Sequence, residues 1–220
     1  TGIDYRHSDL DGNYAGGKDF VNSDLDPMDD NGHGTHVAGT IAAEDNNAGV
    51  VGVAPQARLY ALKVLNSAAN GYWSDVIAAM DWAVANGMQV ANLSLGGSSD
   101  PGVTVKAAFD NAQAAGLLTV AIAGNMNGGA VIYPAKYQSV IAVSATTDTD
   151  TLAPFRSVGP EVELAAPGKS IYSTYKGGGY ATLDGTSFAS PHVAGTAALV
   201  IASGITDANG NGKINDEVRQ

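Results

Sequence analysis

The sequence predicts an α/β fold in which helices cover both faces of a mostly parallel sheet. Three segments, Val90–Leu95, Leu117–Ala123 and Val140–Ala145, have the length and apolar character of strands, and helical patterns alternate with strands along the chain. Near-continuous apolar strands that alternate with helices are typical of a parallel sheet buried on both sides. We therefore predict a single three-layer αβα domain over residues 1–220.

The boundaries of several predicted elements are marked by residues that start or stop them. Residues 1–30 are polar and rich in loops. Ser74 can cap a helix and Gly87 can end it, because a serine hydroxyl accepts a hydrogen bond from a helix N-terminus and glycine tolerates the backbone conformation that follows a helix. In chain order, the other predicted elements are a helix after His33, a strand at Arg58–Leu65, a helix at Ser74–Asn86, a helix from Pro101 to Gly116 and a helix that reaches about Ala202.

Composition narrows the possible classes of function. Hydrophobic residues make up 45% of the chain and charged residues 15%, which is the balance of a compact globular protein. A formal net charge of −11 argues against nucleic acid and anionic membranes as partners. The absence of cysteine excludes disulfides and thiolate zinc sites. The longest apolar run, near Val193–Ala202, is too short to span a membrane.

Nucleotide-binding and esterase motifs are not met by this sequence. Gly168-Lys169-Ser170 ends like a phosphate-binding loop, but Glu163 stands where the first glycine of that loop is needed. No Gly-x-Gly-x-x-Gly follows a predicted strand. Around Ser187 the esterase pattern Gly-x-Ser-x-Gly is also incomplete, because Ala189 takes the position of the last glycine.

Three polar residues at the ends of predicted elements suggest nucleophilic catalysis. Ser187 lies in a tight Gly-Thr turn at the start of a helix, where free N–H groups can stabilise a developing negative charge, and Pro191 is expected in the first turn. His33 lies at a glycine-rich helix start, and Asn125 follows a buried strand. A serine needs an imidazole to take its proton. Each residue also has an ordinary interpretation, as a helix cap, a surface histidine or a turn asparagine.

Together with their flanking residues, these positions resemble the subtilases, the subtilisin-like serine proteases, and most of all the bacterial subtilisin branch. The matching blocks follow the family order along nearly the whole chain. They are His33–Thr40, Asn92–Gly97, Ala123–Asn125, Tyr133–Ala135, Val140–Val143, Ala166–Gly168 and Gly185–Gly195. The resemblance implies a subtilisin-like fold and a serine endopeptidase that hydrolyses peptide bonds of extended polypeptides.

The resemblance also assigns catalytic roles to residues of this chain. It implies that Ser187 is the nucleophile that forms an acyl-enzyme, that His33 is the general base, and that the Asn125 side chain and the Ser187 N–H form the oxyanion hole. His36 and His192 fall inside helices and are expected to be structural.

The substrate-binding segments implied by the resemblance lie on either side of a pocket. One is an edge strand that pairs with the substrate backbone, and the other forms the opposite pocket wall. Ile132 precedes Tyr133 at a position where small residues are common in the family, and we expect it to shorten the pocket floor. The two segments consist of Ser94, Leu95, Gly96 and Gly97, and of Ala121, Ile122, Ala123 and Gly124.

The family also uses an aspartate to orient the histidine and stabilise its charged form. The resemblance places this aspartate one residue before Thr1, whereas Asp4 matches a different family position. The chain therefore resembles a fragment that lacks the N-terminal strand and stops at Gln220, within the next helix. We expect this fragment alone to be a poor protease.

Two loops are expected to bind structural calcium, which prefers six to eight oxygen ligands. The resemblance implies a tight site formed by Asp9 and the loop at residues 44–50, for which the alternative is a merely polar turn. Its expected ligands are the Asp9 carboxylate, the Asn46 amide oxygen and the carbonyl oxygens of Glu44, Ala48 and Val50.

The second candidate loop, Asp207–Glu217, departs from most subtilisins and has the spacing of the first part of an EF-hand. Its expected ligands are the side chains of Asp207, Asn209 and Asn211 and the carbonyl oxygen of Lys213. Glu217 falls at position eleven of the loop, where an EF-hand would have its glutamate at twelve. The alternative is a turn that leads into a helix capped by Asn215.

We conclude from the sequence that the chain is a calcium-stabilised serine endopeptidase. The expected partners are polypeptide substrates and an N-terminal propeptide, and the expected state is a secreted monomer. Two alternatives remain open. One is an inactive subtilase-like domain that binds peptides or calcium, and the other is an intracellular regulatory subtilase in the cytoplasm.

Overall fold

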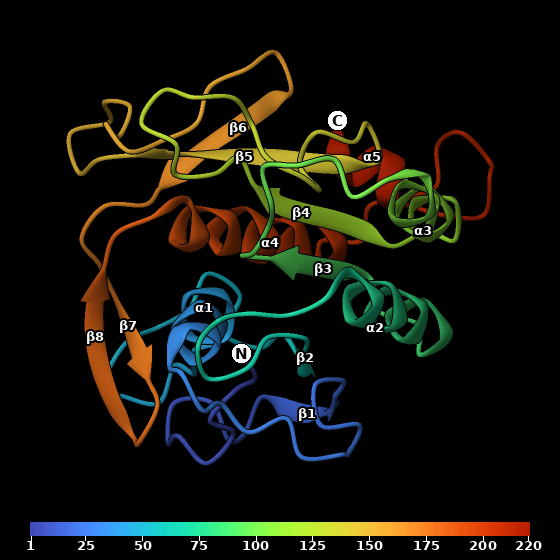
Figure 1. Cartoon of the computed structure of the whole chain (residues 1–220). Helices are drawn as coiled ribbons and strands as arrows, with labels where there is room; N and C mark the ends of the chain where they lie inside the picture. Colours follow the sequence, from blue (N-terminus) through green and yellow to red (C-terminus); the bar gives the residue numbers. More distant parts are fainter. The chain divides into compact units, whose positions relative to one another are not determined.

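The computed structural model describes all 220 residues, which form two compact units (Figure 1). The first unit contains Thr1–Ala79 and Ile171–Leu183, and the second contains Met80–Ser170 and Asp184–Gln220. The first unit thus includes a segment, Ile171–Leu183, that is distant from its other residues in sequence. The single domain expected over residues 1–220 stays a prediction.

The second unit is built on a four-stranded parallel sheet, as the sequence predicted. Its strand order is β3-β4-β5-β6, and every neighbouring pair is parallel. Helix α4 contacts all four strands, and α3 packs against β4, whose five residues are all buried (Figure 1). The elements are β3 (Val90–Leu93), α3 (Val103–Ala114), β4 (Leu118–Ile122), β5 (Val140–Thr146), β6 (Val162–Pro167), α4 (Thr186–Ala202) and α5 (Asn215–Arg219).

The carboxyl ends of these strands bring candidate site residues to one edge of the sheet. Because Leu93 at the end of β3 pairs with Ala121 in β4, the segments that follow the two strands leave the sheet side by side. Ser94 begins the first of these segments and Asn125 lies in the second. The parallel topology therefore explains how residues some thirty positions apart in sequence reach the same edge.

The first unit contains a parallel strand pair and an antiparallel hairpin. Helix α1 packs against β7, and the buried His36 ring in α1 bonds through Nε2 to the carbonyl oxygens of Ile171 at 3.0 Å and Ala181 at 3.1 Å. His36 thus joins the helix to the hairpin. The elements are β1 (Tyr14–Asp19) parallel to β2 (Leu59–Lys63), α1 (His33–Ala42), and β7 (Ile171–Tyr175) antiparallel to β8 (Gly179–Leu183). Helix α2 (Trp73–Ala85) begins in the first unit and ends in the second.

The structure differs from the predicted elements in several respects. Helix α2 begins at Trp73, so Ser74 lies inside the helix and does not cap it, and α5 follows Ile214, so Asn215 is its first residue and not its cap. Strands β6, β7 and β8 were not predicted.

Residues 1–30 include strand β1, whose Gly16-Gly17 pair obscures any strand pattern in the sequence. A Cβ at Gly17 would stand 2.1 Å from the Ala61 carbonyl oxygen of β2, so only glycine permits the two strands to pair here. Helix α4 begins at Thr186, so Pro191 lies in its second turn and not in the first. The proline therefore removes an internal helix hydrogen bond.

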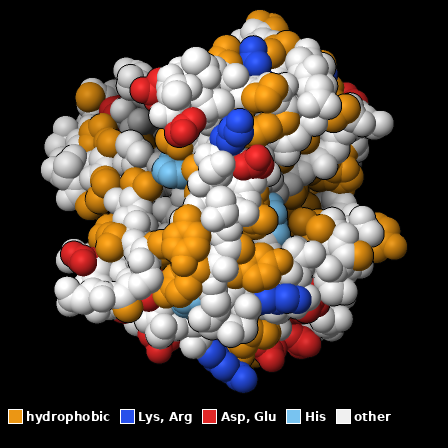
Figure 2. All heavy atoms as spheres, turned by 90° about the vertical axis from the view of Figure 1, so that its left-hand side faces the viewer, with side chains coloured by type: hydrophobic (Ala, Val, Ile, Leu, Met, Phe, Trp, Pro, Cys, Tyr) orange, Lys and Arg blue, Asp and Glu red, His pale blue; other side chains and the backbone are white.

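The helices and one face of the surface bear on the kind of environment that the chain contacts. None of the helices has both the length and the apolar character that crossing a bilayer requires. Acidic and basic side chains are interspersed on the face that carries β7 and β8, among hydrophobic side chains (Figure 2). Tyr172 of β7 is 56% exposed on its hairpin.

Candidate active site

Ser187 is the second residue of helix α4, and the local backbone explains its placement. Gly185 before the helix has φ 153° and ψ 158°, a combination that is open almost only to glycine. Pro191 has no N–H to donate to the Ser187 carbonyl four residues earlier, and the Ser94 hydroxyl donates to that carbonyl instead, at 2.7 Å. The Ser187 N–H has no hydrogen-bond acceptor within the chain. The serine is thus held by its carbonyl while its N–H stays available.

The Asn125 carboxamide is fixed by the residue that precedes Ser187. Its Oδ1 accepts hydrogen bonds from both the N–H and the hydroxyl of Thr186, each at 2.9 Å. The amide orientation follows from this pair of donors, because Nδ2 could not accept from them. Nδ2 therefore points away from Thr186 and donates to no group of the chain. Asn125 is an exposed residue. Its Nδ2 is a free donor beside the start of α4.

A chain of hydrogen bonds ties the first turn of α4 to the end of β3. The Ser190 hydroxyl donates to Asn92 Oδ1 at 2.7 Å, and Asn92 Nδ2 donates to the Ser94 hydroxyl oxygen at 3.0 Å. Ser94 completes the chain through its bond to the Ser187 carbonyl. Sequence reasoning gave Asn92 and Ser190 no role, although both belong to the blocks that carry the resemblance.

The two predicted substrate-binding segments are joined by the residues Ile132 and Tyr133. Gly97 and Tyr133 exchange both backbone hydrogen bonds, each at 2.9 Å, as an antiparallel pair does. The Ile132 N–H donates to the Ala123 carbonyl at 3.0 Å. Ser94–Gly97 and Ala121–Gly124 are therefore connected through one intervening segment.

His33 is the first residue of α1 in the first unit, where a buried carboxylate organises the helix start. The Asp29 carboxylate accepts from the Gly32 N–H at 2.9 Å and from both the N–H and the hydroxyl of Thr35, at 2.9 and 2.6 Å. The His33 N–H donates to Asn31 Oδ1 at 3.1 Å. Burial acts to raise the pKa of Asp29, but these hydrogen bonds outweigh it and hold the pKa below its ordinary value.

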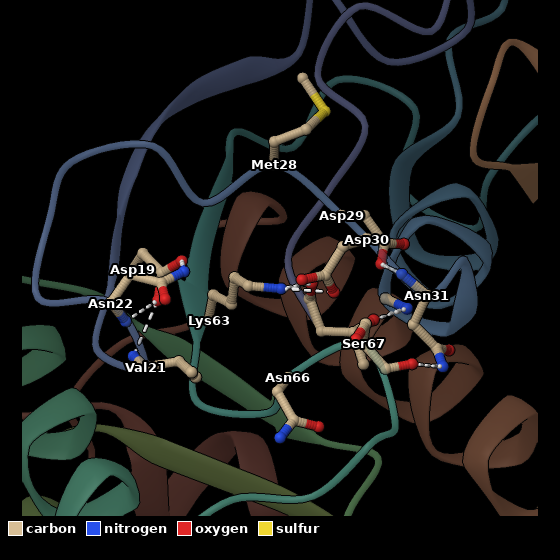
Figure 3. A network of polar contacts seen from close by, with 12 residues as sticks. Asp19, Val21, Asn22, Met28, Asp29, Asp30, Asn31, Lys63, Asn66 and Ser67 are labelled. Atoms are coloured by element: carbon tan, nitrogen blue, oxygen red, sulfur yellow. Dashed lines mark hydrogen bonds and ion pairs between the residues drawn. The ribbon is translucent and has the colours of Figure 1, made fainter.

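Thr1 lies beside the start of α1 and is held from two sides. The Gly34 N–H donates to Thr1 Oγ1 at 2.9 Å. Lys63 of β2, which is 1% exposed, donates through Nζ to the Thr1 carbonyl and to Asp30 Oδ1, both at 2.7 Å (Figure 3). The sequence did not reveal this role of Lys63, because its two partners are distant in sequence and no motif links them.

Burial and nearby charge together favour the neutral form of His33. The pKa of His33 falls from 6.5 to about 4, first because the ring is partly buried and next because the Thr1 ammonium group is close. The Asp29 carboxylate opposes this shift, and His36 adds to it. A neutral imidazole can accept a proton, which is the property that a general base needs.

The predicted ligands of the tight calcium site lie together in the first unit. Asp9 is fully buried, and its carboxylate accepts from the Val50 N–H at 3.1 Å and the Tyr180 hydroxyl at 2.8 Å, with Asn46 Nδ2 at 3.3 Å. The Glu44 N–H donates to the Asp9 carbonyl at 2.8 Å. Partial burial and the neighbouring Asp9 raise the pKa of Tyr180 to about 12. Tyr180 was missed because it lies on β8, far from Asp9 in sequence.

The backbone of the Asp207–Glu217 loop is hydrogen-bonded to the side chain of its first residue, Asp207. The Asp207 carboxylate accepts from three backbone N–H groups, those of Gly210 at 2.8 Å, Asn211 at 3.1 Å and Gly212 at 2.7 Å. Glu217 of α5 turns back to the loop, where Oε1 accepts from the Asn209 N–H at 3.1 Å and Oε2 is buried without a hydrogen-bond partner. Sequence spacing alone had left Glu217 out of the ligand set.

Neither loop gathers a cluster of charged ligands. No group of three or more His, Cys, Asp or Glu side chains in the chain is arranged to hold a metal ion. A cation at these loops would therefore rely on amide and carbonyl oxygens beside one carboxylate.

The chain belongs to the subtilase family, whose sequence profile matches residues 1–210, and it is a serine endopeptidase of that type. It is 50% identical to Subtilisin DY of Bacillus licheniformis over 206 residues, which are 92% of this chain and 74% of that protein. It is also 50% identical to Subtilisin Savinase of Lederbergia lenta over 200 residues, 91% of this chain and 73% of the relative.

A solved structure confirms the predicted fold. The crystal structure of a cold adapted subtilisin-like serine proteinase matches with a TM-score of 0.86 and 39% sequence identity. The match covers 93% of this chain and 73% of that protein. The parallel sheet with its covering helices is therefore the subtilisin-like α/β fold.

The lowered pKa of His33 predicts how this residue responds to pH. Above pH 6.5 the contribution of His33 to the stability of the fold is fully present. As the pH falls toward 4, the imidazole becomes protonated in the unfolded chain but stays neutral in the native chain, so this contribution is lost. An NMR titration of the ring should give a pKa about 4. Acetylation of the Thr1 amino group should raise this pKa, because it removes the neighbouring positive charge. A pKa near 6.5 that does not respond to acetylation would contradict the prediction.

Proposed function

We propose that the chain cleaves peptide bonds of extended polypeptides through an acyl-enzyme on Ser187. The observation that carries this proposal is the pair of unused donors at the start of α4, the Ser187 N–H and Asn125 Nδ2. Together these two donors would stabilise the negative charge that develops on the carbonyl oxygen of the substrate. An ordinary helix cap would not need a second residue held so that its N–H₂ group faces outward.

The proposed reaction proceeds in two halves. The Ser187 hydroxyl attacks the carbonyl carbon of the substrate and gives its proton to the His33 imidazole, while the oxyanion takes hydrogen bonds from Asn125 and the Ser187 N–H. Collapse breaks the C–N bond, and His33 returns the proton to the leaving amine. Water then attacks the acyl-enzyme by the same route and releases the acid and free Ser187.

A carboxylate beside His33 belongs to the same proposal, and we assign it to the residue before Thr1. Thr1 Oγ1 already accepts the Gly34 N–H next to His33, and Lys63 holds the Thr1 carbonyl. A carboxylate attached at this point would orient the imidazole and stabilise its cationic form. Asp29 is less suited, because its oxygens already accept hydrogen bonds from the backbone and from Thr35.

Substrate binding is proposed at the segment that extends β3. Ser94–Gly97 follows β3 directly, and within this segment only Gly97 forms a β-bridge, with Tyr133. An extended peptide could add as a further strand at Leu95 and Gly96. Ala121–Gly124 would form the facing wall of the pocket for the residue before the cut.

The setting in the cell and the partners are proposed from the family and from charge. We propose secretion, an N-terminal propeptide and a monomeric state, since the relatives are subtilisins and alkaline proteases. The net charge of −11 supports polypeptides, and not nucleic acid or anionic membranes, as partners. An inactive peptide- or calcium-binding domain and an intracellular subtilase are the competing proposals.

The nucleophile is tested by labelling and by substitution. In the full-length enzyme, a fluorophosphonate probe should modify Ser187, and Ser187→Ala should abolish labelling and nearly all hydrolysis of a chromogenic peptide, because no other group can form the acyl-enzyme. Ser203→Ala, which alters an exposed serine after the same helix, should change neither. Labelling at another residue, or wild-type turnover of Ser187→Ala, would refute the assignment and favour the inactive-domain alternative.

Loss of the Asn125 donor should slow catalysis without weakening binding. Asn125→Leu should lower kcat by roughly 10²–10³-fold with little change in KM. This range is the loss of kcat known for removal of the corresponding asparagine from a subtilisin. Thr186→Val removes only one of the two donors that orient Asn125, so it should lower kcat far less. Steady-state kinetics on one chromogenic peptide measure both. A change confined to KM would mean that Asn125 contacts substrate in its ground state.

We also propose that both candidate loops bind structural calcium. Asp9 fits a cation because its carboxylate is fully buried with only neutral hydrogen-bond donors around it, and a buried charge without a counter-charge is costly. The Asn46 oxygen accepts from the Ala48 N–H at 3.0 Å, so the Asn46 side chain would have to give up this bond and rotate for its oxygen to join Asp9 on a cation. The carbonyl oxygens of Glu44, Ala48 and Val50 would complete the set.

The Asp207–Glu217 loop fits a cation through oxygens that already converge on its interior. We propose the side chains of Asp207, Asn209 and Asn211 and the Lys213 carbonyl as ligands. The buried, unpartnered Oε2 of Glu217 supports an additional ligand that spacing alone did not predict. In both loops calcium would act by stabilising the folded chain, with no part in the chemical step.

Calcium should raise thermal stability at both loops. Chelation should lower Tm, because calcium at about 100 times its Kd stabilises the native state by about 2.7 kcal/mol per site. Asp9→Ala and Asp207→Ala should each reduce the bound calcium, measured by atomic emission after dialysis, by one ion. Asp81→Ala, at an exposed acid on α2, is the control and should change nothing. An unchanged count for either loop variant would show that its loop is only a turn.

A further inference from the structure

We propose that Lys63 is a positioning residue for His33, because it ties together the two segments that meet at the start of helix α1. One of these segments contains Thr1 and the other contains Asp30, and all four residues lie in the first unit. The inference rests on the proposed function, in which His33 is the general base. It adds to that function a residue that touches neither the substrate nor the reacting atoms.

Lys63 is a charged residue at a position of β2 where the burial pattern favours an apolar one. Alternate residues of the strand, Leu59, Ala61 and Lys63, are buried, and the first two belong to a hydrophobic core cluster. Lysine is almost never fully buried unless its charge is paired. An apolar residue would complete this face of the strand without the cost of burying a charge. The ammonium group is therefore expected to do more than fill the core.

The ammonium group of Lys63 is bonded to both segments that lead to the start of α1. Its Nζ donates to the Thr1 carbonyl oxygen and to Asp30 Oδ1, each at 2.7 Å (Figure 3). The backbone of the lysine is itself held, because the Phe20 N–H donates to the Lys63 carbonyl oxygen at 2.8 Å. The Asp30 side chain is 45% exposed, so this bond ties a surface carboxylate to the interior. Lys63 thus links the end of β2 to two segments that are far apart in sequence.

Each of the two segments is hydrogen-bonded to the first turn of α1. On one side, Thr1 Oγ1 accepts from the N–H of Gly34, the residue after His33, at 2.9 Å. On the other side, Asn31 Oδ1 accepts from the His33 N–H at 3.1 Å, and Asn31 directly follows the aspartate that Lys63 binds. A shift of either segment would therefore be passed to the backbone that carries the imidazole.

The alternative is that Lys63 only stabilises the fold. Removal of the ammonium group would cost the Thr1 carbonyl a hydrogen bond, which by itself lowers the free energy of unfolding. A loss of stability changes the fraction of folded enzyme, but it does not change kcat of the folded molecules well below Tm. A displaced His33 lowers kcat of the folded molecules, because a misplacement of about 1 Å caused by a distant change can cost about 10²-fold. The two roles therefore differ in a measurable quantity.

The test measures kcat and KM of the full-length enzyme on one chromogenic peptide, with the folded fraction determined by circular dichroism. Lys63→Met keeps an unbranched apolar side chain and removes the ammonium group. It should lower kcat by roughly 10–100-fold. KM should stay nearly unchanged, because the hydrogen bonds of Lys63 go to residues outside the proposed substrate-binding segments. Lys106→Met, which breaks an exposed ion pair with Asp110 on α3, is the matched control and should change neither constant.

A charge-balanced variant separates position from electrostatics. Lys63→Met alone leaves the Asp30 carboxylate unpaired, and an unpaired charge would act on His33 through its electric field. Lys63→Met combined with Asp30→Asn removes both charges and restores no hydrogen bond to the Thr1 carbonyl. The kcat of this double variant should stay as low as that of Lys63→Met. Recovery to the wild-type value would overturn the positioning role and would show that charge alone was responsible.

A double-mutant cycle shows whether Lys63 acts through His33. His33→Ala should lower kcat far more than Lys63→Met, because it removes the proposed general base. In the His33→Ala background, Lys63→Met should cause no further loss of the residual kcat, because residues that act through one group are not additive. A further loss as large as in the wild-type background would overturn the inference, since the substitution would then disturb the enzyme independently of His33.

The outcomes separate this inference from the function on which it rests. Wild-type turnover of His33→Ala, or fluorophosphonate labelling at a residue other than Ser187, would overturn the proposed function. Loss of turnover in His33→Ala together with a wild-type kcat of folded Lys63→Met would overturn the role of Lys63 alone. If Lys63→Met does not fold, Lys63→Gln replaces it, and a wild-type kcat of that variant would likewise overturn the role.

Discussion

The double hydrogen bond from Thr186 to Asn125 is the interaction on which the candidate site depends. Because Oδ1 accepts both the N–H and the hydroxyl of Thr186, the carboxamide is committed to one orientation. The same bond ties the segment after β4 to the residue before Ser187, so the proposed nucleophile and the proposed oxyanion donor are held together. Strand register, the unusual backbone of Gly185 and the helix start at Thr186 all serve to bring these two residues together.

The proline inside helix α4 also helps to fix the candidate site. Proline in the second turn costs the helix one hydrogen bond, and the freed Ser187 carbonyl is the group that Ser94 contacts. With an ordinary residue at position 191, that carbonyl would also have a partner within the helix, and the hydroxyl of Ser94, the residue after β3, would share it with that partner. The local loss of helix stability thus fixes the serine relative to the strand that is proposed to bind substrate.

Sequence patterns predicted those parts of the structure that are local in the chain. Buried strands and helix starts were readable, as were the short loops around Asn46 and Asp207, because neighbouring residues determine them. Contacts between distant segments were not, and Tyr180 on Asp9 and Lys63 on the Thr1 carbonyl belong to this kind. Strand β1 was missed because glycines interrupt it, and β6 because its exposed edge position leaves no apolar pattern.

The electrostatics of His33 show how burial and nearby charge set the strength of this residue as a base. Burial and the Thr1 ammonium together hold the pKa of His33 near 4, whereas a general base works best with a pKa close to the working pH. Asp29 is near enough to raise the pKa of the His33 ring, but its carboxylate oxygens already accept hydrogen bonds from the residues that start helix α1. Blocking the Thr1 ammonium would remove one unfavourable charge, and a carboxylate beside the ring would have the opposite effect on the pKa of His33. Such a carboxylate would bring the pKa of His33 back toward neutrality and would stabilise the imidazolium that the proposed proton transfer from Ser187 would create.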